Sequence, residues 1–65
     1  MKLFAENVSD ICVEFLKKSG YSFIKITSLN FSQGRWNVTA DVGAIVEIKK
    51  TIVVDDENGK VIEYG

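Results

Sequence analysis

The chain has 65 residues, of which 46% are apolar and 26% charged, and it contains no proline and no histidine. This composition predicts one small globular domain spanning residues 1–65, because disordered chains are poorer in apolar residues and carry more net charge. Eight basic and nine acidic residues give a net charge of −1 without a basic block, so we expect no nucleic-acid partner. A domain this short buries only about 60% of the surface that its unfolded chain exposes, and is marginally stable as a monomer.

The sequence lacks the ordinary ligand sets of zinc, haem and iron–sulfur sites, because it has no histidine and a single cysteine, Cys12. Cys12 lies between Ile11 and Val13, and we predict that it is a small buried hydrophobic residue. No apolar run approaches the roughly 18 residues of a membrane span, and the first residues lack the apolar segment of an export signal. We therefore expect a cytoplasmic protein with no membrane span, no metal and no other cofactor.

Residues 2–19 have the pattern of an amphipathic helix. Lys17 and Lys18 fall in its last turn, where the free carbonyl groups favour cations, and Gly20 is typical of the left-handed residue that follows a helix. The apolar residues recur at spacings of three and four, which places them on one stripe: Phe4, Val8, Ile11, Cys12, Phe15 and Leu16.

After the helix the apolar period changes to two, which indicates strands. In the first strand, Ile24 and Ile26 differ in parity from Leu29 and Phe31. A β-bulge near residues 27–28 would turn all four side chains toward the helix.

The next strand, residues 35–42, is the most regular, because apolar even-numbered residues alternate with polar odd-numbered ones. We expect Trp36 to be a core residue that faces the helix stripe at Phe4, Ile11 and Phe15. A three-residue connection centred on Gly43 would keep the even-numbered set facing inward, and one long strand bent at this glycine is the alternative for residues 42–50. The later members of the even-numbered apolar set are Val46, Ile48, Ile52 and Val54.

Residues 55–60 read Asp-Asp-Glu-Asn-Gly-Lys, which predicts a three-residue hairpin loop with Gly59 in the left-handed region. An EF-hand calcium loop needs a ligand at its first position, and counting back from Gly59 puts Val54 there. We therefore expect the acidic residues to form a solvated hairpin tip and not a calcium site. The predicted pairs are Asp56 with Lys60, Val54 with Ile62, and Ile52 with Tyr64.

Together these elements predict an α+β fold, in which one N-terminal helix packs on a four-stranded antiparallel meander sheet in two layers. The odd-numbered residues then face solvent, and apolar residues among them, with Phe23, form a candidate contact patch. Scattered surface aliphatic residues without a function are the alternative. The residues of the predicted patch are Phe23, Ile45, Val53 and Val61.

The sequence offers few groups for catalysis. Its acids and bases are nine carboxylates, and no phosphate-binding loop, nucleophile elbow or paired-carboxylate motif is present. We therefore expect no enzymatic activity. Six of the carboxylates are expected on the hairpin tip or the outer sheet face, where water keeps their pKa values near the reference values. These six are Asp41, Glu47, Asp55, Asp56, Glu57 and Glu63.

Residues 34–42 and 52–64 resemble the gas vesicle protein O family, which has a tryptophan-led strand, a strand of the form Y-E-V-x-L-D, a D-G turn and a strand that ends in tyrosine. Residues 53–63, V-V-D-x-x-x-G-K-V-I-E, also resemble the last two strands of a PepSY-type domain. The first resemblance implies an accessory or assembly protein, and the second a self-associating or peptidase-restraining module. A small-ligand carrier is a third hypothesis, although 65 residues leave little room for a pocket.

The sequence also predicts a protein partner, which is most simply a second copy of the chain. A single helix covers only one face of the sheet, and the strand that ends at Tyr64 leaves an unpaired edge. We therefore expect a homodimer that forms through the outer face or an edge of the sheet.

Overall fold

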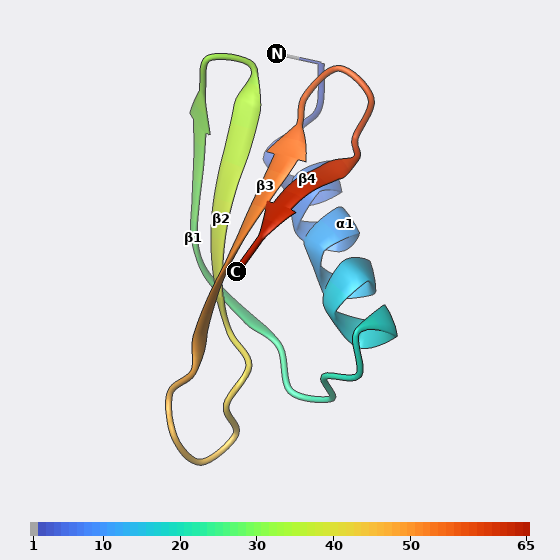
Figure 1. The fold of residues 1–65 in the computed structure, drawn as a ribbon. Coiled ribbons are helices and arrows are strands. Elements are labelled where there is room, and N and C mark those ends of the chain that lie inside the picture. The colour runs from blue at the N-terminus through green and yellow to red at the C-terminus, as the bar shows by residue number, and fades with distance from the viewer. Residues whose placement is uncertain (1) are drawn as a thin grey trace.

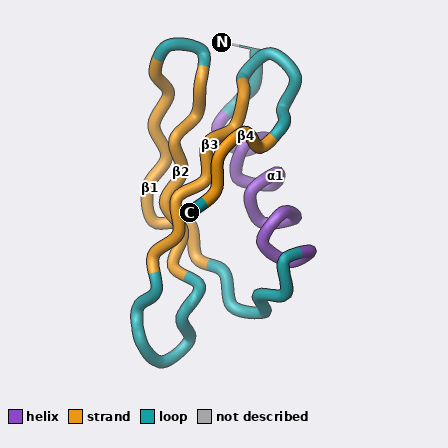
Figure 2. The backbone as a smooth tube through the Cα atoms, viewed as in Figure 1, coloured by secondary structure: helices purple, strands orange, loops and turns teal. Residues whose placement is uncertain are grey.

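The computed structural model describes residues 2–65 and shows one helix and four strands there. The helix α1 spans Ala5–Lys18, and the strands β1, β2, β3 and β4 span Lys25–Ser32, Arg35–Asp41, Lys49–Asp55 and Val61–Tyr64 (Figure 1). The strands form one antiparallel sheet in the order β1-β2-β3-β4. The helix lies along one face of this sheet (Figure 2). The predicted α+β fold, with an N-terminal helix on a meander sheet, is therefore confirmed.

The helix α1 begins at Ala5, later than the sequence predicts. The backbone N–H groups of Lys2 and Leu3 instead donate to the carboxylate of Asp56, at 2.6 and 2.9 Å. The N–H group of Phe4 donates to the side-chain oxygen of Asn7 at 3.0 Å and so closes the first turn. Phe4 has extended backbone at this position and is 71% exposed, so the prediction that it belongs to the core stripe is wrong.

The end of α1 has the predicted geometry. Gly20 has a φ of +103°, a conformation that costs glycine little because it has no Cβ. The N–H group of Tyr21 donates to the carbonyl oxygen of Leu16 at 3.1 Å, which satisfies one of the last carbonyls of the helix. Residues 19–24 then connect the helix to β1 (Figure 1).

The core lies between α1 and the covered face of the sheet. On the helix, Val8, Cys12 and Leu16 are spaced by four residues and are fully buried. Cys12 is thus a small buried hydrophobic residue, as predicted, and burial raises the pKa of its thiol to about 11. The prediction that Trp36 is a core residue is also confirmed. The buried residues that the sheet contributes to this core are Trp36, Val38, Ala40, Val42, Ile52 and Val54.

The strand β1 contains the predicted bulge. Ile26 pairs with Ala40 on β2, whereas Ser28 pairs with Thr39, so Thr27 is the extra residue. Ile24, Ile26 and Leu29 accordingly all pack against the core, although their parities differ.

The connection between β2 and β3 is a hairpin, but a longer one than predicted. Asp41 pairs with Lys49, which leaves residues 42–48 as a loop in place of a three-residue connection around Gly43. Val46 and Ile48 therefore leave the inward-facing series and are 69% and 47% exposed. An added Cβ at Gly43 would lie 1.7 Å from the carbonyl oxygen of Val46, so the fold of this loop requires glycine there.

The hairpin between β3 and β4 has the predicted pairing at its open end and a different one near its turn. Ile52 pairs with Tyr64 as expected, but Val54 pairs with Val61 and not with Ile62. A register shift between residues 53 and 54 accounts for this difference. The prediction that Val61 faces solvent is therefore wrong, since this residue packs against the core.

Candidate functional site

The four residues of the predicted contact patch lie in different parts of the structure. Ile45 is 98% exposed in loop 42–48, and Phe23 is partly exposed in the connection between α1 and β1. Val53 lies on β3 and is 7% exposed, whereas Val61 pairs with the next residue of β3, Val54, and packs against the core on the other face of the sheet. The structure therefore does not join these residues into one patch, because the long loop carries Ile45 off the sheet and the register shift turns Val61 inward.

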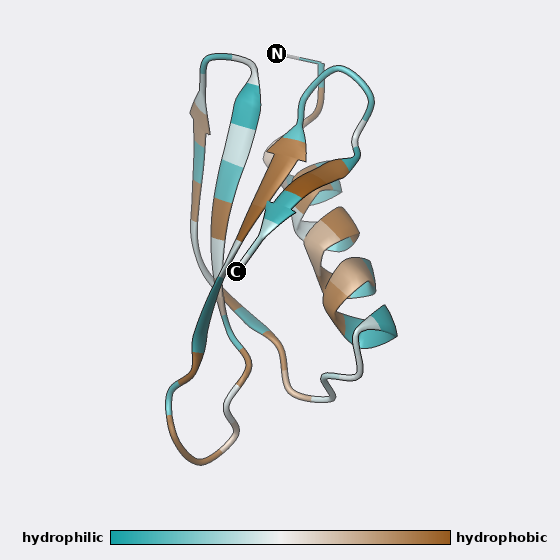
Figure 3. Ribbon diagram, in the orientation of Figure 1, coloured by the Kyte–Doolittle hydropathy of each residue, from teal (hydrophilic) through white to brown (hydrophobic). Residues whose placement is uncertain are grey.

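Three exposed large apolar side chains lie close together in residues 42–48, which we call the apolar loop. Ile45, Val46 and Ile48 are exposed there, and the loop projects beyond the hydrogen-bonded part of the sheet (Figure 3). Large aliphatic side chains that cluster on a surface mark a contact with something outside the domain more often than isolated ones do. The apolar loop is therefore the first candidate contact site.

Hydrogen bonds hold the apolar loop in one shape. The carboxylate of Asp41 accepts from the N–H groups of Gly43 and Ile48, at 3.0 and 3.1 Å. These two bonds, together with the nearby Lys25 and Lys49, lower the pKa of the Asp41 carboxyl. The N–H group of Val42 donates to the carbonyl oxygen of Ile48 at 2.9 Å and closes the base of the loop. Asp41, which the sequence places on the outer sheet face, is therefore the residue that shapes the loop.

Lysines lie around the base of the apolar loop. The sheet register places Lys25 and Lys49 on the two sides of Asp41. Lys50 pairs with Ala40 and, as the next residue along β3, points to the opposite face of the sheet from its neighbour. Positive charge therefore lies on both faces of the sheet at this end.

The end of α1 adds further positive charge to the same end of the molecule. Lys17 and Lys18 are the last two helical residues, and the connection 19–24 joins them to the start of β1 (Figure 1). Asp41 and Glu47 are the acidic residues of β2 and the loop at this end. Glu14 lies one turn before the two helix lysines. The five lysines outnumber these three carboxylates, so the end with the apolar loop is basic although the whole chain has a net charge of −1.

A second feature is the free edge of the sheet at β1. In the described chain this strand pairs only with β2, so its other side presents backbone N–H and C=O groups without a strand partner. Residues 28–32 read Ser-Leu-Asn-Phe-Ser and contain no charge and no proline. Lys25 and the bulge at Thr27 protect only the first part of this edge. The second half of β1 can therefore accept another strand.

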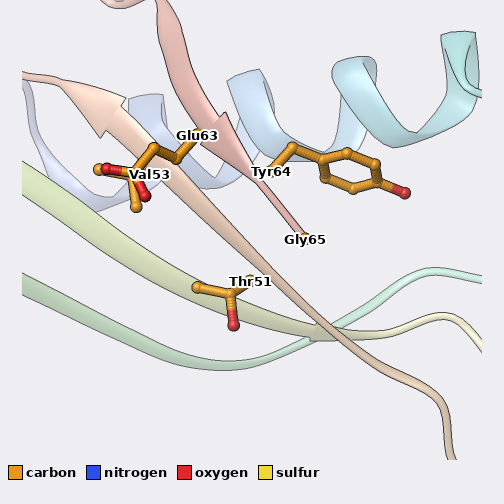
Figure 4. A pocket seen from close by; sticks show the side chains of 5 residues that line it. All are labelled: Thr51, Val53, Glu63, Tyr64 and Gly65. Carbon is orange, nitrogen blue, oxygen red and sulfur yellow. The ribbon is translucent and has the colours of Figure 1, made fainter.

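A shallow groove of about 380 Å³ lies beside the end of β4 (Figure 4). Its lining residues are Thr51, Val53, Glu63, Tyr64 and Gly65. The ring of Tyr64 points away from this groove toward α1, where it packs edge-on against Phe15 with ring centres 5.1 Å apart. Its hydroxyl donates to that of Tyr21 at 3.0 Å. The groove thus combines one carboxylate, Glu63, with an open surface, and it offers little to enclose a small ligand.

Asp56 is the acidic residue whose surroundings the sequence predicts wrongly. It was expected at a solvated hairpin tip, yet it is 5% exposed. Its carboxylate accepts from the Trp36 Nε1–H at 2.9 Å, as well as from the N–H groups of Lys2 and Leu3. Its own N–H group donates to the carbonyl oxygen of Gly34 at 3.1 Å. Asp56 therefore ties the start of the chain, the β1–β2 turn and β2 to the β3–β4 turn.

The pKa of Asp56 follows from these contacts. Burial by itself would raise the pKa of this carboxyl, but the donated hydrogen bonds from Leu3, Trp36 and Lys2 outweigh it and lower the pKa to about 2. A carboxylate that is ionised and occupied in this way suits a structural role better than proton transfer. An Asp two residues before an Asn-Gly pair does not by itself reveal this role in the sequence.

The described residues contain no cluster of three or more His, Cys, Asp or Glu side chains with the geometry of a metal site. Within residues 2–65 no helix has both the length and the apolar character needed to cross a bilayer.

Comparison of the chain with protein-family models, curated proteins and solved structures found no match. The function must therefore be inferred from the surface of the molecule.

Proposed function

We propose that the protein is a cytoplasmic, non-enzymatic accessory or assembly protein that acts through protein contacts. The observation that supports this proposal is the free edge of β1, where residues 28–32 offer unpaired backbone without charge or proline. Such an edge binds another extended strand through main-chain hydrogen bonds. The simplest partner is β1 of a second copy, because antiparallel pairing of two identical edges closes under twofold symmetry.

Phe31 gives this edge an apolar contact in addition to its backbone groups. Its ring lies 5.1 Å from that of Trp36, measured between centres, and remains partly exposed beside the edge. A strand that pairs with β1 would cover this ring. The outer sheet face offers less to a partner, since its apolar residue Val53 is already buried. We therefore place the protein contact at the edge and not on the face.

The resemblance to the gas vesicle protein O family suggests the assembly that the protein serves. A gene for this chain that lies among gas vesicle genes would support an accessory role in that assembly. A position among peptidase genes would favour the PepSY-like alternative of a restraining module. Under both hypotheses the protein binds another protein and does not catalyse a reaction.

Sedimentation equilibrium tests strand pairing at β1 directly. At protein concentrations on the order of tens of micromolar, we expect the wild type to have twice the monomer mass. Asn30→Lys places a charge on each of two apposed edges and should give a monomer. Thr51→Lys adds the same charge to the outer face of β3 and should remain dimeric. A wild-type monomer, or a dimer that only Thr51→Lys dissociates, would contradict the proposed edge contact.

A further inference from the structure

We propose that the apolar loop, residues 42–48, docks the protein on the surface of an anionic lipid bilayer. This inference rests on the end of the molecule opposite the β3–β4 turn and does not depend on the proposed contact at β1. Its three components are exposed aliphatic side chains, a surrounding group of lysines and a loop whose shape is set by hydrogen bonds.

The exposed side chains supply the apolar contact. Ile45 is 98% exposed, and Val46 and Ile48 beside it are 69% and 47% exposed. The loop that carries them extends beyond the strands of the sheet (Figure 3). They can therefore enter the boundary between lipid headgroups and acyl chains while the sheet stays in water. Removal of these aliphatic groups from water provides the favourable free energy.

The lysines supply the preference for negative lipid headgroups. Lys25, Lys49 and Lys50 surround the base of the loop on both faces of the sheet. Lys17 and Lys18 at the end of α1 extend the basic region sideways (Figure 1). A planar layer of anionic headgroups can contact charges on both sides of a projecting loop at once. The leaflet of a cell membrane that faces the cytoplasm carries such headgroups.

The difference in charge between the two ends favours one orientation of the molecule on that surface. Asp55 and Glu57 lie in and beside the β3–β4 turn, and Glu6 lies in the first turn of α1. In Figure 1 the β3–β4 turn and the apolar loop lie at opposite ends of the molecule. Lys2, which pairs with Glu57 at 3.0 Å, Arg35 and Lys60 lie at the end with the β3–β4 turn too, so this end has no excess of positive charge. An anionic surface attracts the lysine-rich end more strongly, so the long axis of the molecule, 35 Å, stands away from the bilayer with the loop toward it.

The fixed shape of the loop lowers the entropic cost of docking. Asp41 accepts two backbone N–H groups of the loop, and the carbonyl oxygen of Val46 lies over Gly43. The loop is thus ordered in the free protein, and binding does not have to order it. The hydrogen bonds also satisfy backbone N–H groups that would otherwise lose water on entering the headgroup region.

Vesicle sedimentation tests the proposal. The purified full chain is mixed with phosphatidylcholine vesicles that contain about 30% phosphatidylglycerol, or with phosphatidylcholine vesicles alone, and the bound fraction is measured. We expect binding to the anionic vesicles only, weakened several-fold at about 0.5 M salt. Ile45→Asp should reduce binding at least about tenfold, because it removes an aliphatic group and adds a negative charge. The double variant Lys49→Glu, Lys50→Glu should reduce it at least about 20-fold, since each lysine contributes a factor of about five.

A matched control uses the exposed aromatic residue at the other end. Phe4→Asp also replaces a large exposed apolar residue with a negative charge, at the N-cap of α1, where aspartate is favourable. We expect its binding to equal that of the wild type. Ile45 makes little contact with the fold, so its variants should keep the circular dichroism spectrum and Tm of the wild type.

A probe at the loop gives an independent readout. An environment-sensitive thiol label on Ile45→Cys should react there alone, because Cys12 is fully buried, and should report an apolar environment with anionic vesicles. Absence of wild-type binding to these vesicles, or equal binding by Ile45→Asp, would overturn the proposal. Loop-dependent binding to an acidic protein without binding to vesicles would also overturn it. None of these results bears on the dimer at β1, which sedimentation equilibrium tests separately.

Discussion

Replacement of Trp36 should remove a large part of the stability of the domain. The residue is 6% exposed in the core cluster, its ring lies tilted by 59° against that of Phe31, and its Nε1–H donates to Asp56 at 2.9 Å. Trp36→Ala leaves a cavity that the neighbouring strands cannot fill, and such substitutions cost about 3–5 kcal/mol. A chain of 65 residues has a total stability of roughly 3–10 kcal/mol, so the variant should be partly or fully unfolded at 25 °C.

The assay is thermal unfolding followed by circular dichroism, with Trp36→Phe as the companion variant. Phenylalanine keeps a ring beside Phe31 but has no donor for Asp56, so we expect a smaller fall in Tm than for alanine. The wild-type fluorescence provides a second check, since the emission maximum of a buried tryptophan lies at shorter wavelength than in water. A Trp36→Ala variant with a Tm within a few degrees of the wild type would refute the reasoning, because about 3 kcal/mol corresponds to more than about 12 °C in so small a domain.

Two further predictions concern a carboxylate and a glycine. The pKa of Asp56 is lowered to about 2, so its contribution to stability is present above the ordinary carboxyl pKa near 4 and is lost as pH falls toward 2. The difference in Tm between wild type and Asp56→Asn should therefore shrink between pH 4 and pH 2, with exposed Asp10→Asn as the charge control; a constant difference would contradict this. Gly43→Ala should lower the stability by about 1–3 kcal/mol in chemical denaturation, because its Cβ would lie 1.7 Å from the carbonyl oxygen of Val46. Exposed Ala44→Ser is its control, and equal stability of the two variants would show that the loop adopts another shape.

From the sequence, one residue of the candidate contact site could be predicted, but the surface that it forms with its neighbours could not. The sequence shows that Ile45 does not belong to the inward-facing series, and the residue is indeed exposed. Its neighbours Val46 and Ile48 have the parity of core residues, yet they lie in the same exposed loop. The lysines are distant from one another in sequence, and only the pairing of β1, β2 and β3 places Lys25 and Lys49 beside Asp41. A basic end on a chain of net charge −1 is consequently not visible in its composition.

The amino-acid sequence by itself determined the features that depend on neighbours along the chain. The spacing of Val8, Cys12 and Leu16 defines the buried side of the helix, because residues four apart share a face. The left-handed conformations at Gly20 and Gly59 were predictable, since few other residues adopt them at low cost. The change of parity along β1 revealed the bulge at Thr27 before any partner strand was known.

Tertiary structure alone decided the lengths of the two later turns and the role of Asp56. An alternating pattern is compatible with any register that preserves parity, so it could not distinguish a three-residue connection from the loop 42–48. The turn after β3 depends on donors from elsewhere in the chain, because the carboxylate of Asp56 enters the fold to accept N–H groups from Leu3 and Trp36. Leu3 lies 53 positions and Trp36 lies 20 positions from Asp56 in the sequence. Hydrogen bonds over such separations form only when the helix and sheet have packed, which is why local pattern could not predict them.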